Sequence, residues 1–297
     1  MFLTSVSTFA FSLAKLLLLP TAIVTAGSSS SLQGRNVGGG DLLVAPARVV
    51  FLGSTRTVDV NLLNIGTHTA TYRISLIHER MNADGSLMEI ETPGAGEHFA
   101  DDLVRFTPRQ VVLQPNVSQL VRIQLREPGD LEAGEYRSHL LFRAIPDVVA
   151  NDLNPNLALA SDVSATGISM QLSPVYGVSI PLIVRRGKTE AKVGMKDLRL
   201  SKNTEGNQVV TGTLTRSGNQ STYGELYLAY TPVGGKSVVI GTLGGVAVYS
   251  PNTDRNFSIQ VALPIGVSLR GGNIKVVYRG SAAEDAKLIT EGILDLS

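Results

Sequence analysis

The chain has 297 residues, of which 43% are hydrophobic, and its 26 Lys and Arg nearly balance its 25 Asp and Glu. This length is enough for two domains with sizeable cores, and the apolar content argues against a disordered chain. The balanced charge gives no sign of a nucleic-acid surface, and the absence of cysteine excludes disulfides, thiolate metal sites and cysteine nucleophiles.

The first 26 residues are almost wholly apolar, and Lys15 is their only charge. An apolar run follows Lys15 and ends in small residues at Ala26, a pattern that predicts a signal peptide over residues 1–26 and export of the rest. The alternative is an uncleaved membrane anchor, because the stretch is long enough to span a bilayer. Residues 27–40 are rich in Ser and Gly and are expected to form a flexible tether.

The rest of the chain is dominated by alternation of apolar and polar residues, which indicates half-buried strands. It is clearest over residues 58–62, 72–76, 121–125 and 257–263. Turn signals separate such runs, among them Asp84-Gly85 and Gly234-Gly235. Short strands at close spacing predict an all-β protein with two immunoglobulin-like β-sandwich domains, over residues 41–187 and 188–297.

The segment from residue 146 to 184 holds the most unusual pattern. Residues 146–167 are poor in alternating apolar residues, and we expect a long mobile loop. From Ile168 to Val184, apolar side chains then occupy the even-numbered positions: Ile168, Met170, Leu172, Pro174, Tyr176, Val178, Ile180, Leu182 and Val184. One strand of this length exceeds what a sandwich buries, so its first half is expected to be an exposed edge that pairs with a partner. The alternative is two shorter strands broken at Pro174 or Pro181.

Catalytic motifs are absent from the sequence. Residues 232–237 end like a phosphate-binding loop but lack its first glycine, and His78-Glu79 lacks the second histidine of a zinc-protease motif. The four histidines have no metal-ligand spacing. We therefore expect no enzyme activity, no cofactor, no metal and no small-molecule substrate.

The order of the strand motifs resembles the PapD-like periplasmic chaperones of chaperone–usher pilus systems, in the archaic or alternate branch. The matching segments are residues 43–50 with Arg48, 59–64, 106–115 with 119–123, 134–143, 180–185, 216–221 with 223–226, and 245–252.

The resemblance implies two immunoglobulin-like domains in an angled, L-shaped arrangement in a periplasmic protein. It implies pilus subunits and an outer-membrane usher as partners, with no nucleic acid. Arg48 is then expected to bind the subunit's C-terminal carboxylate. The donated strand is expected to insert four side chains into the subunit, namely Ile168, Met170, Leu172 and Tyr176.

One position departs from the family pattern. A second cleft cation, a lysine near Pro181, is missing, and Arg137 and Arg143 are the candidates to replace it. The rival hypothesis is an exported two-domain immunoglobulin-like surface or adhesion module that binds something else.

Overall fold

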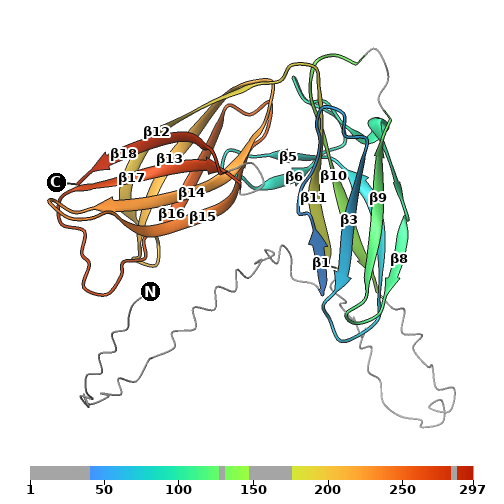
Figure 1. Cartoon of the computed structure of the whole chain (residues 1–297), viewed down its shortest axis with the longest axis horizontal. Coiled ribbons are helices and arrows are strands. Elements are labelled where there is room, and N and C mark those ends of the chain that lie inside the picture. Colours follow the sequence, from blue (N-terminus) through green and yellow to red (C-terminus); the bar gives the residue numbers. More distant parts are fainter. Residues whose placement is uncertain (1–40, 127–130, 147–175, 282–285, 297) are drawn as a thin grey trace, which may run out of the picture. The chain divides into compact units, whose positions relative to one another are not determined.

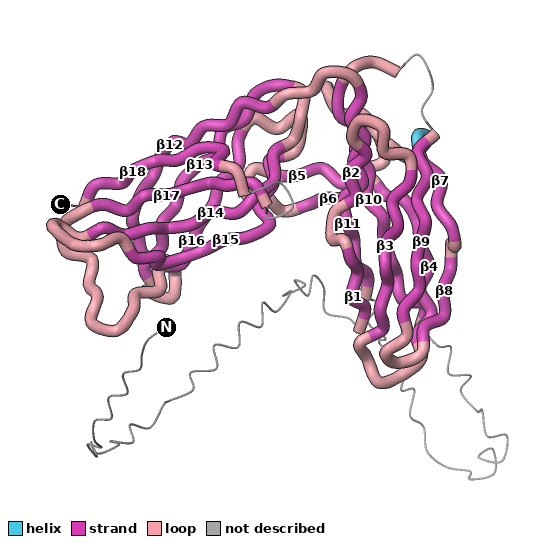
Figure 2. Tube along the Cα trace, in the orientation of Figure 1, coloured by secondary structure: helices cyan, strands magenta, loops and turns pink. Residues whose placement is uncertain are grey.

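The computed structural model describes residues 41–126, 131–146, 176–281 and 286–296, and their regular secondary structure is almost only β-strand, joined by loops (Figures 1 and 2). Among them the one short helical element is a 3₁₀ turn, η1 (Asp101–Leu103). No helix in the described part of the chain is long and apolar enough to cross a membrane.

The first sandwich consists of two sheets. One has the order β1-β3-β9-β7 and the other β2-β11-β10-β4-β8. A separate two-stranded sheet pairs β5 with β6. The bounds are β1 Leu42–Ala45, β2 Val49–Phe51, β3 Thr57–Asn64, β4 Ala70–Ile77, β5 Glu79–Met81, β6 Leu87–Glu89, β7 Val104–Thr107, β8 Gln110–Leu113, β9 Ser118–Leu125, β10 Gly134–Ile145 and β11 Gly177–Arg186.

The second sandwich also has two sheets, in the orders β12-β13-β16 and β15-β14-β17-β18. Its core is separate from that of the first sandwich. The bounds are β12 Ala191–Lys202, β13 Gln208–Gly218, β14 Thr222–Thr231, β15 Val238–Val248, β16 Asp254–Gln260, β17 Asn273–Gly280 and β18 Leu288–Asp295. The all-β prediction of two sandwiches is therefore confirmed.

The alternation in the sequence correctly identified the buried faces. Val60 and Leu62 of β3 and Val121 and Ile123 of β9 are fully buried in the first core. The Asp84-Gly85 signal lies in the turn between β5 and β6, and Gly85 has a φ of 86°, which glycine adopts without strain.

The segment resembling the family's first strand is divided between two sheets. β1 pairs with β3 in one sheet, whereas β2 runs parallel to β11 in the other. Pro46 lies in the crossing segment, where its missing N–H takes no ladder bond away. Arg48 comes at the end of this crossing, directly before β2.

β11 runs through Pro181 without a break, so the alternative of a strand interrupted there is wrong. The Tyr176 carbonyl accepts a hydrogen bond from the Ala144 N–H (2.9 Å), which places the even-numbered main-chain groups toward β10. Pro181 is an odd-numbered residue, so the backbone nitrogen that lacks a hydrogen faces away from β10. The other possible break, Pro174, lies outside the described residues.

The second half of the alternating segment belongs to the core of the first sandwich, as predicted. Val178, Ile180, Leu182 and Val184 are at most 7% exposed. Tyr176 has the same parity but is 54% exposed, because it lies just before β11 begins.

Replacing Ile180 by Ser should therefore destabilise the first sandwich by about 3–5 kcal/mol, since it removes a buried apolar side chain and buries a hydroxyl. Tyr176→Ser is the matched control with the same parity, and it should change the free energy of unfolding by less than about 1 kcal/mol. Denaturant titrations of both variants test this. Equal losses would show that the core extends beyond the start of β11.

Candidate functional site

The Arg48 side chain is buried without a hydrogen-bond partner among the described residues. All three guanidinium nitrogens are shielded from solvent and donate to no acceptor. The group lies over the ring of Tyr223 on β14, 4.7 Å from the ring centroid, which is a cation–π contact. A shielded guanidinium with five unused donors is a place where a carboxylate would bind strongly.

Arg137 of β10 supplies a second cation beside Arg48. Its guanidinium donates to the carbonyls of Ser250 (3.1 Å) and Glu79 (3.4 Å) and lies 4.3 Å from the ring centroid of Tyr249. Burial lowers the pKa of Arg137, and the nearby positive charge of Arg48 lowers it further. The two guanidinium groups therefore lie close enough for the charge of Arg48 to repel that of Arg137.

The structure separates the two candidates for the missing second cation. Arg137 lies opposite Ile183 in the β10–β11 register, whereas Arg143 lies opposite Gly177, six residues further along, and is exposed. Six residues of strand span about 20 Å, so only Arg137 lies in the neighbourhood of Arg48. A lysine on β11 is not needed to place a second positive charge there.

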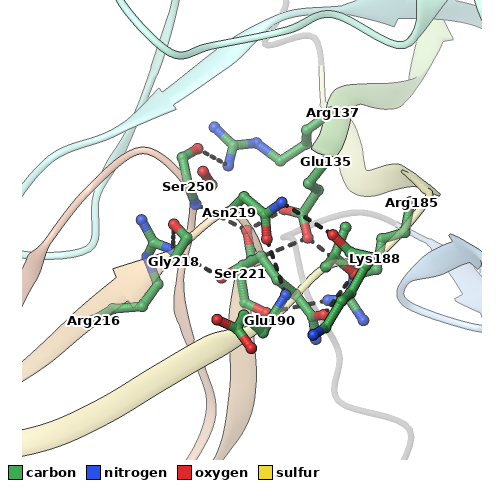
Figure 3. Close-up of polar contacts among 12 residues, drawn as sticks. Glu135, Arg137, Arg185, Lys188, Glu190, Arg216, Gly218, Asn219, Ser221 and Ser250 are labelled. Carbon is green, nitrogen blue, oxygen red and sulfur yellow. Dashed lines mark hydrogen bonds and ion pairs between the residues drawn. The ribbon is translucent and has the colours of Figure 1, made fainter. Parts of the chain in front are cut away.

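Glu135 connects the two sandwiches close to Arg137 (Figure 3). Its buried carboxylate accepts hydrogen bonds from the Ser221 hydroxyl, from the Ser221 N–H (3.0 Å) and from Arg185 Nε (3.0 Å). Arg185 also donates to the Ser221 carbonyl (3.1 Å). A buried carboxylate with this many donors is well satisfied, and removing one partner of such a network is strongly destabilising.

The loop that carries Ser221 is shaped by Arg216 of β13. This arginine donates to the carbonyls of Gly218 (2.8 Å), Gln220 (2.9 Å) and Asn252 (2.8 Å), and its side chain points into the loop (Figure 3). Burial lowers the pKa of Arg216. The residues between Gly218 and Ser221 are therefore held from inside the second sandwich as well as by Glu135.

Glu79, Ser179 and His139 form a buried polar group on β5, β11 and β10. The Ser179 hydroxyl donates to Glu79 Oε2 (3.0 Å), and His139 Nε2 lies 3.3 Å from the same oxygen. This second contact is not a hydrogen bond, and neither ring nitrogen of His139 has a hydrogen-bond partner. Burial raises the pKa of Glu79, and burial together with Arg137 lowers that of His139 to about 3. His139 is therefore a neutral imidazole.

A second arrangement superficially resembles a hydrolase triad. His78 Nδ1 lies 3.2 Å from the Ser138 hydroxyl, and His78 Nε2 lies 3.8 Å from Asp101. Ser138 is fully buried, and its oxygen accepts a hydrogen bond from the Ala100 N–H (2.9 Å). No substrate reaches this hydroxyl, so the group acts as a structural hydrogen-bond network. No cluster of His, Asp or Glu in the described residues is arranged to hold a metal ion.

The predicted donor residues are only partly within the described structure. Tyr176 is described and exposed, whereas Ile168, Met170 and Leu172 lie outside the described residues. The sequence motifs included Glu135, Ser221 and Tyr223 without giving them a role in the site. Their role depends on contacts between distant segments: Glu135 and Ser221 are 86 residues apart, and Tyr223 contacts Arg48 much further back in the chain, which spacing along the chain does not reveal.

Several solved structures of pilus chaperones are similar to this chain at low sequence identity. No protein-family model matches the chain, and no curated protein matches it. The structure of the YadV chaperone is similar over 86% of this chain and 100% of that one, with 12% identity and a TM-score of 0.41. A chaperone–tip adhesion subunit complex, CsuC–CsuE from Acinetobacter baumannii Csu pili, is similar over 86% and 97%, with 13% identity and a TM-score of 0.39. The SafA pilin–SafB chaperone complex of Salmonella enterica is similar over 87% and 97%, with 16% identity and a TM-score of 0.39.

The buried His139 should make the fold sensitive to acid. Its folded pKa of about 3 lies below its ordinary value of 6.5, so between these values the unfolded chain binds a proton that the folded chain does not. The free energy of unfolding should therefore fall as the pH drops through this window, by about 2 kcal/mol at pH 5. The raised pKa of Glu79 has the opposite effect on stability, because the folded chain binds this proton more tightly than the unfolded chain does.

His139→Gln removes the histidine and leaves Glu79 in place, so the loss of stability between pH 7 and pH 5 should shrink by about 2 kcal/mol. Denaturant titrations at the two pH values measure the difference. His68→Gln, at an exposed histidine, is the control and should leave it unchanged. An unaltered pH dependence in His139→Gln would show that His139 titrates normally in the folded chain.

Proposed function

We propose that the chain is a periplasmic chaperone that holds pilus subunits by lending them the edge of β11 and passes them to an outer-membrane usher. Export with removal of residues 1–26 belongs to the same proposal. The observation that carries it is an open strand edge close to a buried arginine without an acceptor. The subunit is the partner class named with the Csu and Saf chaperones.

The open edge lies along the first half of β11. On one side, β11 pairs with β10 over all ten of its residues, from Gly177 to Arg186. On the other side, the only described strand that pairs with it is β2, and only at Leu182, Ile183 and Val184. The main-chain groups of Gly177 and Ser179 point to this side. Soluble proteins normally cover such edges because they recruit other chains, which supports strand addition as the use of this one.

The even-numbered side chains of this segment would then pack in two places, the core of the first sandwich and a groove in the subunit. From Val178 onward they fill the first sandwich, and Tyr176 continues the same parity outside it. Ile168, Met170 and Leu172 have this parity too, and we propose that with Tyr176 they enter a groove in the subunit. Main-chain hydrogen bonds would give affinity, and the alternate side chains would give the register.

Arg48 and Arg137 would bind the terminal carboxylate of the subunit. A buried guanidinium without an acceptor is costly in the free protein, and a carboxylate would satisfy its donors and neutralise two neighbouring cations. Lysine would not reproduce a two-bond contact to both oxygens, because its ammonium acts as a point charge.

Arg48→Ala should abolish capture of a subunit without lowering the stability of the chaperone, because Arg48 donates to no acceptor in the described structure. The loss of a buried charged partner typically costs about 2–5 kcal/mol, which corresponds to binding that is roughly 30-fold weaker or more. The measurement is recovery of complexes after periplasmic co-expression with candidate subunits, alongside thermal unfolding of the free variant.

Arg143→Ala is the matched control, because it removes an exposed arginine from the same sandwich and should leave capture unchanged. If Arg48→Ala retains full capture, Arg48 is not the anchor. If the wild-type chain captures no subunit and instead binds a glycan or a host protein, the chain is a surface module.

The open edge can be tested separately with Ser179→Pro. Residue 179 has the same parity as Pro181, so its N–H faces away from β10 and the substitution should leave the β10 ladder intact. It removes one donor to the incoming strand, worth about 0.5–1.5 kcal/mol, so subunit affinity should fall roughly 2- to 10-fold.

Ser179→Ala is the control, because both variants lose the hydroxyl bond to Glu79 and only the proline loses the N–H. Subunit affinity measured for both, together with their melting temperatures, separates the two effects. Equal affinities for the proline and alanine variants would show that no strand pairs with this edge.

A further inference from the structure

We propose that Tyr223 is a gate over the anchor: its ring covers Arg48 in the free protein and is displaced by the incoming subunit carboxylate. This inference rests on the proposed function. Under this proposal, a residue of the second sandwich controls access to a cation of the first sandwich.

Arg48 is covered rather than merely buried. Its three nitrogens are shielded although no acceptor lies against them, and the ring of Tyr223 lies 4.7 Å from the guanidinium carbon. Tyr223 follows Ser221 by two residues, and Ser221 is bound by Glu135 through both its hydroxyl and its N–H. The segment that carries the ring is therefore fixed at one end next to the site.

The cavity on the Arg137 side of the two cations is too small for a carboxylate as it stands. The cavity beside Arg137, lined in part by Glu79, Glu135 and Ser250, has a volume of about 10 Å³. That is room for about one water molecule. A peptide terminus can bind there only if a neighbouring side chain moves.

Tyr223 is the side chain placed to move. A small apolar cluster at this contact consists of Met81, Ile183, Ala247 and Tyr249, which are buried, and of Val50 and Tyr223, which pack against it while partly exposed. Tyr249 is 5% exposed and lies under Arg137, so shifting it would open the centre of the cluster. Tyr223 lies at the rim, and turning it outward would uncover Arg48 while leaving the centre in place.

The exchange is favourable because a carboxylate offers Arg48 more than the ring does. The ring contacts one face of the guanidinium and leaves every N–H without an acceptor, whereas a carboxylate accepts two of them and compensates the repulsion between Arg48 and Arg137. Binding to a site that is open only part of the time is weakened by the open fraction, so a variant without the cover should bind faster.

The test uses the full-length chaperone and a subunit that it captures. Tyr223→Ala should raise the association rate constant roughly 3- to 10-fold, because the open fraction approaches one. Tyr223→Phe keeps the ring face and should associate like the wild type. Tyr227→Ala is the matched control, since it removes a tyrosine of the same parity on β14 at a distance from Arg48. An association rate for Tyr223→Ala that is unchanged or slower overturns the gate.

A labelling experiment keeps the inference testable if Tyr223→Ala folds poorly. Phenylglyoxal modifies accessible arginines, and mass spectrometry locates the adducts. In the free wild-type chain, Arg48 should react at least 10-fold more slowly than the exposed Arg143, and subunit binding should protect it further. Equal labelling of Arg48 and Arg143 in the free chain overturns the gate. If Arg48→Ala captures subunits normally, the anchor itself fails, and this outcome is distinct from a failure of the gate alone.

Discussion

The alternation of residues along β11 is the constraint on which the site depends. The even-numbered residues direct their side chains into the first core and their main-chain groups toward β10. The odd-numbered residues do the opposite, with side chains toward the polar and aromatic groups around Arg137 and main-chain groups toward the open edge. One strand therefore supports the core, lines the cation site and presents the edge, and a shift of one residue would exchange all of these roles.

The charged groups around β11 differ in how fully their hydrogen bonds are satisfied. Glu135 accepts three hydrogen bonds at the contact between the sandwiches, and Arg216 donates to three carbonyls. Arg48 has no acceptor and lies beside a second cation. Among the described residues, the guanidinium of Arg48 thus contrasts with these well-satisfied charges, and such exceptions are expected at functional sites, which supports the proposal that Arg48 binds a ligand.

Sequence patterns predicted the parts of the fold that depend on local rules. The period of two located the buried faces of β3, β4, β9 and β11, and Asp84-Gly85 located a hairpin. The site was less accessible, because Tyr223 and Glu135 act through contacts with residues far away in the chain. β11 lacks a lysine near Pro181, whereas the register of β10 brings Arg137, one of the two candidates to replace it, next to the same place. The register between two strands is not visible in either strand alone.

In the proposed function, the anchor and the open edge would together fix the register of the incoming strand. An extended chain that pairs along Gly177 and Ser179 can form similar main-chain hydrogen bonds in several registers. Half of these registers would place its side chains on the wrong face of the sheet, because a shift of one residue turns every side chain to the other face. Arg48 directly precedes β2, and β2 lies on the same side of β11 as the open edge. A carboxylate held there would fix the end of the incoming strand, and the parity of all its residues would follow. Under this proposal, a fixed charge beside the open edge would convert a surface that pairs with any strand into one that accepts a strand in a single register.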